Sequence, residues 1–297
     1  MERDEFLAGE FEEHRDHLKA VAYRMLGSVA EAEDAVQEAW LRLQRSDDRG
    51  IVNLGGWLTT AVARVSLDML RARRAKAAEP IGEEWRMPDP LIERGGELDP
   101  EREALLADSV GLALLVVLET LSPAERLAFV LHDMFSVPFD EIAGIVGRSP
   151  EASRQLASRA RRRVRGSAPA PDGSLRRRRE VGDAFMAASR DGRFEDLLAL
   201  LDPDVVLRVD DGTAPRIVRG ADAVSRQAFA NARLAEFARP AVVNGGPGGV
   251  VVQDGVAVSV VALTVAGGRI VAMDILADPQ RLAQLDLSEF GVEHRAS

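Results

Sequence analysis

The chain has 297 residues, of which 46% are hydrophobic, and its formal net charge at pH 7 is −10. This length predicts two or three folded units with hydrophobic cores. The chain has no cysteine, which excludes disulfides, thiolate catalysis and cysteine-ligated metal centres, and its four histidines argue against a histidine-rich metal site. No apolar run approaches the roughly 18 residues that span a bilayer. No secretory signal opens the chain, so we expect a cytoplasmic protein with no membrane contact. We also expect no cofactor.

Residues 6–78 are expected to form an all-helical unit. Apolar residues recur at helical spacing up to Gly27, where a glycine and a serine break the pattern. A second helix follows with the sequence AEAEDAVQEAWLRLQR, which has acids in its first turn. After the polar loop SDDRGIVNLGG, a third helix, GWLTTAVARVSLDMLRARRAK, ends in a basic run.

Residues 79–107 are predicted to be an acidic linker without regular structure, because they are rich in proline, glycine and acids. From Glu79 to Asp108 there are ten acids and three arginines, whereas from Arg148 to Arg165 there are seven arginines and one acid. Salt confines the effect of such charges to about 10 Å. The local charge of each segment therefore matters more than the acidic total.

Residues 108–166 are expected to form a second helical unit that contains a helix-turn-helix. Gly147 suits a left-handed helix end, and Ser149 suits an N-cap in front of Pro150. The helix that begins there has small and apolar residues on one face and a polar, arginine-rich opposite face. This combination predicts a helix that reads DNA, although an ordinary helical hairpin with a solvated basic face has the same pattern.

After a linker at residues 167–175, residues 176–288 predict a small α+β domain. Two helices, at 176–189 and 194–201, precede a series of valine-rich strands. Two of these strands, 256–265 and 269–276, are joined by the glycine turn AGG and are expected to form a hairpin in an antiparallel sheet.

The two helical units together resemble a bacterial RNA polymerase sigma factor of the extracytoplasmic-function type. EAEDAVQEAWLRL resembles the helix of region 2 that contacts the polymerase clamp, and GWLTTAVARVSLDMLRARRA resembles the helix and loop that engage the minus-10 promoter element. Residues 122–164 resemble region 4, which reads the minus-35 element. The resemblance implies core RNA polymerase, through its β′ clamp and β flap, and promoter DNA as partners.

The resemblance also implies site residues, each of which has an alternative role as a solvated or core side chain. Promoter opening needs a surface that holds an unpaired base and grips a single strand, and the polar loop 46–56 with the basic third helix suits that task. Arginine pairs well with guanine and glutamine with adenine in the major groove. The candidate polymerase contacts are Asp34, Gln37, Glu38, Trp40 and Leu43. The candidate minus-10 contacts are Asn53, Trp57, Arg64, Arg71 and Arg74. The candidate minus-35 contacts are Arg154, Gln155 and Ser158 for bases, with Arg159, Arg161 and Arg162 for phosphates.

The C-terminal domain resembles the SnoaL-like, nuclear-transport-factor-two-like fold, which sigma factors of the SigJ-like group have at this position. Three segments support the resemblance: WRMPDP in the first linker, DDGTAPR, and DILADPQRL near the end, although the expected glycine-rich turn is here GTAP. The resemblance implies regulation in cis, in which the linker and residues 278–282 approach one another and restrain the DNA-binding units. The candidate regulatory contacts are Trp85, Pro88, Asp89, Pro90, Asp210, Asp211, Gly212, Asp278, Pro279 and Leu282.

No catalytic residue is predicted in this domain. The one tyrosine of the chain, Tyr23, lies in the first unit, and the domain's one histidine, His294, lies in the tail. Asp210, Asp211 and Asp274 lack the partner that isomerase chemistry needs. Two other functions remain open at this stage: a helix-turn-helix repressor or activator that acts without polymerase, and a DNA-binding protein with a sensing or enzymatic C-terminal domain. The sequence also leaves open whether that domain binds a small ligand or dimerises.

Overall fold

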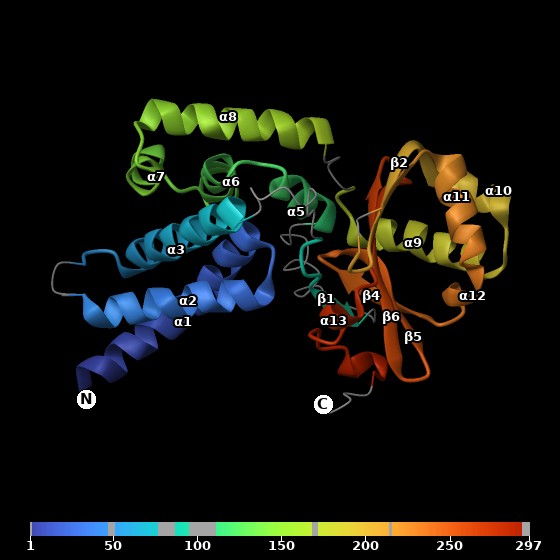
Figure 1. Cartoon of the computed structure of the whole chain (residues 1–297), viewed down its shortest axis with the longest axis horizontal. Helices are drawn as coiled ribbons and strands as arrows, with labels where there is room; N and C mark the ends of the chain where they lie inside the picture. Colours follow the sequence, from blue (N-terminus) through green and yellow to red (C-terminus); the bar gives the residue numbers. More distant parts are fainter. Residues whose placement is uncertain are drawn as a thin grey trace. The chain divides into compact units, whose positions relative to one another are not determined.

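The computed structural model describes residues 2–46, 51–76, 87–94, 111–167, 172–213 and 216–292. The chain divides into two compact units (Figure 1). The first unit combines the helices that end at residue 76 with the chain from 117 to 167, and the second combines residues 87–94 and 111–116 with the C-terminal part.

The first part of unit one is all helical, as predicted. It consists of α1 (Glu2–Leu26), α2 (Val29–Arg45) and α3 (Leu54–Lys76), each of which packs against the other two. Gly27, with a φ of 70°, ends α1 in a conformation that suits glycine. Large apolar side chains from all three helices are almost fully buried and form the core: Leu18, Met25, Leu26, Leu43, Leu58 and Leu67.

The second part of unit one contains the predicted helix-turn-helix. It comprises the end of α5 (Leu112–Glu119), which begins in unit two, followed by α6 (Pro123–Phe129), a π-helical turn η2 (Val130–Met134), α7 (Phe139–Val146) and α8 (Pro150–Ser167). Gly147 has a φ of 73° at the end of α7, and the Ser149 hydroxyl accepts a hydrogen bond from the Ala152 amide (3.2 Å) at the start of α8. Both caps of the turn are thus confirmed.

Hydrogen bonds connect the two parts of unit one. Arg126 of α6 has a side chain only 2% exposed, and it donates to Glu119 Oε1 (2.6 Å) and to the backbone carbonyl of Arg24 in α1 (3.2 Å). Arg73 of α3 donates to the Leu26 carbonyl (3.3 Å) and lies 3.8 Å from Glu119. A buried arginine keeps its charge only where such partners surround it, so these bonds fix α6 against α1 and α3.

The second unit is an α+β domain with one seven-stranded sheet, in the order β1-β4-β5-β6-β7-β2-β3. Its strands are β1 (Ile92–Arg94), β2 (Leu201–Asp210), β3 (Arg216–Arg219), β4 (Ala238–Val243), β5 (Gly246–Gln253), β6 (Val256–Ala266) and β7 (Arg269–Leu276). Its helices are α9 (Leu175–Arg190), α10 (Phe194–Leu200), α11 (Ala221–Ala230), α12 (Ala232–Ala235) and α13 (Pro279–Leu282), with a short η3 (Ser288–Phe290).

The sheet departs from the sequence prediction in two respects. The predicted antiparallel sheet is mixed, because β2 pairs with β7 in parallel. Parallel neighbours are joined by long connections, here through α11, α12 and four strands, and hairpin signals do not reveal them. The linker was expected to lack regular structure, but residues 92–94 form β1 and pair with β4.

Both faces of the sheet are covered. Helices α9, α10 and α11 pack on one face, where Phe185, Leu197 and Leu263 belong to a continuous core (Figure 1). Val260 and Ala262 alternate with that set along β6, point to the opposite face and are also buried. Helix α13 packs against β6.

Candidate nucleic-acid interface and linker junction

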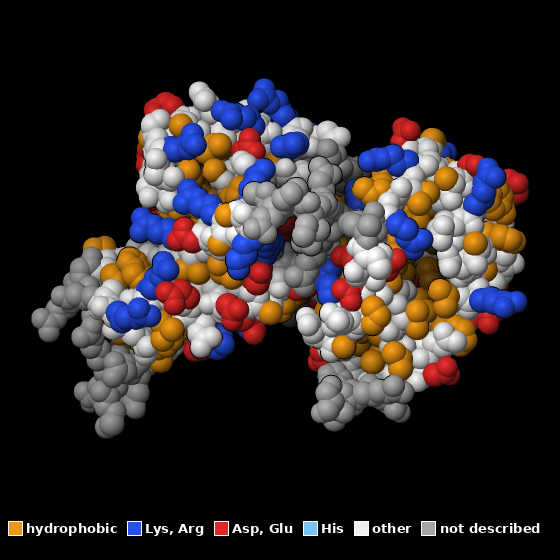
Figure 2. Space-filling model, in the orientation of Figure 1, with side chains coloured by type: hydrophobic (Ala, Val, Ile, Leu, Met, Phe, Trp, Pro, Cys, Tyr) orange, Lys and Arg blue, Asp and Glu red, His pale blue; other side chains and the backbone are white. Residues whose placement is uncertain are grey.

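The outer surface of α8 is the structure's arginine-rich face. Its apolar face is buried, with Ala157 and Ala160 fully inaccessible, whereas the predicted base-reading residues are exposed. Figure 2 shows Lys and Arg side chains gathered over this helix. The exposed candidates are Arg154, Gln155, Ser158, Arg159 and Arg162.

Two of the candidate arginines on α8 have partners within the unit. The Arg161 guanidinium Nε donates to Asp133 Oδ1 (2.6 Å), so this side chain braces α8 against η2 instead of being free for a phosphate. The Arg154 guanidinium lies over the Phe139 ring, 5.6 Å from its centroid, and 3.6 Å from Glu151. These contacts orient Arg154 without burying it.

Helix α3 presents the arginines expected to contact the minus-10 element. Arg64, Arg71 and Arg74 are all exposed. Asn53 Oδ1 accepts a hydrogen bond from the Gly56 amide (3.0 Å), so this atom supports the start of α3 rather than facing a base. Trp57 is half-buried.

Helix α2 divides its candidate polymerase contacts between surface and core. Asp34 and Gln37 are exposed, and Glu38 pairs with Arg42 (2.9 Å). Leu43 is 1% exposed and belongs to the helical core, so it supports α2 from within. The Trp40 ring is half-buried and lies 4.9 Å from the Phe11 ring.

A buried polar junction connects the linker to the C-terminal domain. Arg281 of α13 is 7% exposed and donates to Asp210 Oδ2 (2.8 Å), to Asp89 Oδ1 (2.6 Å) and to the Met87 carbonyl (2.6 Å). Asp210 Oδ2 also accepts from the Met87 amide (3.0 Å). The expected approach between the linker and residues 278–282 is therefore present for residues 87–90.

The candidate residues around the junction have different roles. Asp278 caps α13 by accepting from the Gln280 amide (2.9 Å). Gly212 has a φ of 81°, and a Cβ at this position would lie 3.0 Å from the Asp278 carboxyl carbon. Pro88, Pro90 and Leu282 are buried, Pro279 is exposed, Asp211 accepts from Thr213, and Trp85 lies outside the described residues.

Sequence reasoning missed three members of this region: Arg281, Met87 and Arg208. Arg208 donates to Asp274 Oδ1 (2.6 Å), and Asp274 is 1% exposed. Burial raises the pKa of Asp274, and the charge and hydrogen bond of Arg208 oppose that rise. The signal that points to Arg281 is its position as the one basic residue in ADPQRL, directly after the last strand.

A cavity of about 320 Å³ lies between α9 and the β4–β5 strands, and neither Asp210, Asp211 nor Asp274 lines it. No group of three or more His, Asp or Glu in the described ranges is arranged to hold a metal ion. None of the described helices is both long and apolar enough to cross a membrane.

Comparison with known proteins identifies the helical unit. Residues 11–76 match the Sigma-70 region 2 model and residues 111–164 match the Sigma-70 region 4 model. These two modules, in this order, define a transcription initiation factor of the sigma-70 class. The chain belongs to the extracytoplasmic-function (ECF) sigma factors, which direct transcription initiation and are not enzymes.

The similarity extends over both units. The chain is 40% identical to ECF RNA polymerase sigma factor SigJ of Mycobacterium tuberculosis, over 94% of each protein. It is 34% identical to the probable sigma factor SigI of the same species, over 92% of this chain and 93% of the relative. The crystal structure of SigJ covers 94% of this chain at 37% identity, with a TM-score of 0.75. The two alternatives, a repressor without polymerase and an enzyme with a DNA-binding module, are not supported.

Proposed function

We propose that the C-terminal domain sets the activity of this sigma factor in cis, through the junction at Arg281. The observation that supports this role is that Arg281 contacts the Met87 carbonyl and the Asp89 carboxylate, which lie between regions 2 and 4 in sequence. β1, a few residues further on, adds backbone pairing with β4. The junction therefore attaches the connection between the two DNA-binding regions to the regulatory domain.

The physical consequence concerns the reach of the linker. Residues 87–94 are bound to the second unit, which divides the linker into two connections. The first, residues 77–86, has ten residues and joins the end of α3 to this bound segment. The second, residues 95–110, has sixteen residues and leads on to region 4. An extended chain spans at most about 3.6 Å per residue, so the first connection reaches about 36 Å. Release of residues 87–94 joins the two connections into one longer tether and changes the separations that regions 2 and 4 can adopt.

We propose the following partners for the exposed surfaces. Asp34 and Gln37 of α2 contact the β′ clamp of core polymerase, and the region 4 surface contacts the β flap. Arg64, Arg71 and Arg74 follow the DNA near the minus-10 element, since exposed arginines along a helix suit phosphates. On α8, Arg154, Gln155 and Ser158 meet bases, whereas Arg159 and Arg162 meet phosphates.

The test is run-off transcription with core polymerase and a promoter from the factor's own regulatory region. We expect Arg281→Gln in the full chain to change the transcript yield at least threefold relative to wild type. The matched control is Arg176→Gln, which removes the same charge from an arginine of the second unit that is 86% exposed. We expect the control to match wild type, and equal yields from Arg281→Gln and wild type would contradict regulation through the junction.

A second arm of the experiment uses a chain that ends at Gly166. Its transcript yield, relative to the full chain, gives the sign of the regulation: a higher yield means that the domain restrains initiation, and a lower yield means that it assists. Co-elution of both forms with core polymerase in gel filtration verifies that the surfaces of regions 2 and 4 are intact. An unchanged yield from the truncated chain would contradict the proposal.

A further inference from the structure

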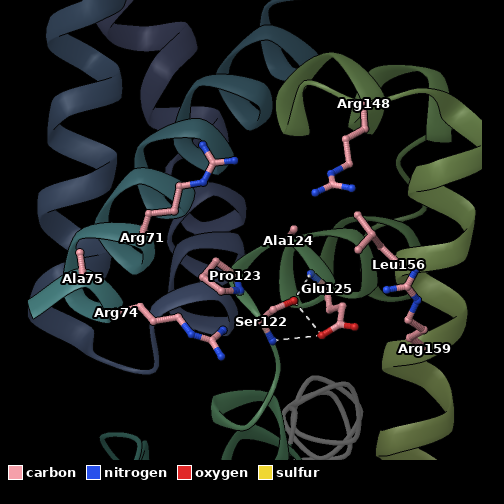
Figure 3. A pocket seen from close by; sticks show the side chains of 10 residues that line it. All are labelled: Arg71, Arg74, Ala75, Ser122, Pro123, Ala124, Glu125, Arg148, Leu156 and Arg159. Carbon is pink, nitrogen blue, oxygen red and sulfur yellow. Dashed lines mark hydrogen bonds between the residues drawn. The ribbon is translucent and has the colours of Figure 1, made fainter. Parts of the chain in front are cut away.

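We propose that the first unit has a binding site for a small polyphosphate anion, in a cavity between α3, α6 and α8. The cavity has a volume of about 540 Å³, within the range of about 300–1,000 Å³ typical of small-molecule sites. Figure 3 shows arginines from opposite sides extending over it. The residues that line it are Arg71, Arg74, Ala75, Ser122, Pro123, Ala124, Glu125, Arg148, Leu156 and Arg159.

The charges of this cavity are unbalanced. Among the residues that the structure describes, four arginines line it against one carboxylate, Glu125. Partial burial raises the pKa of Glu125, but hydrogen bonds from Ser122 and the charges of Arg163 and Arg159 outweigh it, so the pKa lies below its ordinary value. Glu125 is therefore ionised at neutral pH and leaves a net lining charge of +3.

The single carboxylate is also occupied by its own helix. Glu125 Oε2 accepts hydrogen bonds from the Ser122 amide (3.2 Å) and the Ser122 hydroxyl (2.7 Å), which closes the capping box of α6 (Figure 3). Within the described ranges, no carboxylate oxygen lies within 4 Å of the guanidinium groups of Arg74, Arg148 or Arg159. Arg71 lies 3.7 Å from the exposed Asp68.

This arrangement suits phosphate chemistry. A guanidinium group presents paired N–H donors that match the oxygens of a phosphate, and several guanidinium groups in one cavity repel one another until an anion lies between them. A net charge of +3 matches an anion with two or more phosphates. Pro123, Ala124 and Leu156 add apolar side chains to the lining.

Occupation of the cavity by an anion would oppose promoter binding. This part of the proposal rests on the promoter contacts given under the proposed function. Arg71 and Arg74 are assigned to the minus-10 element and Arg159 to the minus-35 element. Those elements lie about 25 base pairs apart, or ~85 Å at 3.4 Å per base pair. One cavity lined by all three arginines exists only while regions 2 and 4 are packed together. A ligand that binds this state alone shifts the equilibrium away from the promoter-bound state.

The binding test needs no polymerase, so its failure is distinguishable from failure of the proposed function. Inorganic tripolyphosphate is titrated calorimetrically into the full chain at low salt. We expect saturable binding that Arg148→Gln weakens roughly tenfold, as expected for one lost charge-assisted contact. Arg148 is exposed and is not among the candidate promoter contacts. The control Arg165→Gln removes the same charge from α8 outside the cavity, and we expect an affinity within twofold of wild type.

Three results would overturn the site. The first is absence of saturable binding, and the second is equal weakening by Arg148→Gln and Arg165→Gln, which indicates diffuse charge attraction. The third is tighter and Arg148-dependent binding of a six-nucleotide thymidine single strand, which assigns the cavity to nucleic-acid phosphates.

As a functional readout, tripolyphosphate should reduce the affinity of the wild-type chain for a promoter duplex and leave that of Arg148→Gln nearly unchanged. Equal reductions in the two proteins would contradict the closed-state effect.

Discussion

Arg281 brings a full positive charge to a position where 7% of its side chain is exposed. Desolvation of a guanidinium costs several kcal/mol, and two carboxylates and one carbonyl at 2.6–2.8 Å offset that cost. The same bonds also satisfy Asp210, which is 6% exposed. The charge and its partners are therefore mutually dependent: removal of Arg281 leaves the buried Asp210 with the hydrogen bonds from the Met87 and Gly212 amides but without its counter-charge.

The first prediction concerns this dependence. Arg281→Met should lower the free energy of unfolding of the second unit by about 3–5 kcal/mol, because Asp210 and Asp89 lose their counter-charge inside the protein. Hydrogen exchange of the β6 and β7 amides reports on this unit. Arg176→Met, at an exposed ion pair, should change the stability by less than about 1 kcal/mol. A loss below about 1 kcal/mol in Arg281→Met would show that water reaches the junction.

Sequence reasoning identified some of these residues and missed others for a physical reason. Asp210 and Asp89 were named because their segments match a family pattern. Arg281 has no local signal of comparable strength, since its partners lie 71 to 194 residues away. Leu43 was named as a candidate polymerase contact with a core role left open, and the packing of three helices buries it. Burial and long-range pairing depend on tertiary structure, which a local pattern does not contain.

Local elements, in contrast, follow from their own residues. The turn between α7 and α8 was predicted from Gly147, Ser149 and Pro150, because positive φ, a side-chain acceptor and a fixed φ each need those residue types. The β6–β7 hairpin was predicted from its glycine pair, and Gly267 and Gly268 both have positive φ. The parallel β2–β7 pair and the strand β1 were missed, since their partners are distant in sequence.

The second prediction concerns Asp172, which supports the β6–β7 hairpin from a neighbouring segment. Its carboxylate accepts from the Gly267 amide (2.8 Å) and the Gly268 amide (2.9 Å), and the hydrogen bonds from Gly268 and Gly267 lower its pKa. A native pKa below the unfolded value means that the native state binds fewer protons. The stabilisation is therefore present above about pH 3.9, the ordinary aspartate pKa, and is lost as the pH falls through the native pKa.

Melting temperatures of wild type and Asp172→Asn check this sign. Wild type should melt higher than the variant at pH 7, and the difference should shrink as the pH falls toward 3. The exposed Asp204→Asn variant controls for the loss of one negative charge. A difference between wild type and Asp172→Asn that is constant from pH 7 to pH 3 would mean that ionisation of Asp172 does not contribute.

At the scale of the whole molecule, the net charge of −10 hides a segment of opposite sign, which is the one proposed to bind DNA. The segment from Arg148 to Arg165 has seven arginines and one acid, and the structure places most of those arginines on the outer surface of α8. The order of the modules was correctly predicted from sequence, because each module has its own motif. The domain boundaries and the individual DNA contacts stay predictions. The dependence of DNA affinity on salt concentration distinguishes contacts to phosphates from contacts to bases.

The third prediction concerns the salt dependence of DNA binding by variants of the α8 arginines. Each phosphate contact contributes about 0.9 to the slope of log K against log salt concentration, so Arg159→Gln and Arg162→Gln should each reduce the slope by about that amount. Arg161→Gln should reduce it less, because Arg161 is bonded to Asp133 in the free protein (2.6 Å). Arg154→Gln should instead relax the preference for one base at the minus-35 element. Fluorescence anisotropy of a labelled minus-35 duplex across a salt series measures all four variants. Equal slope changes at Arg154, Arg159, Arg161 and Arg162 would mean that α8 contacts DNA only as a diffuse positive surface, and that its internal contacts do not select which arginines bind.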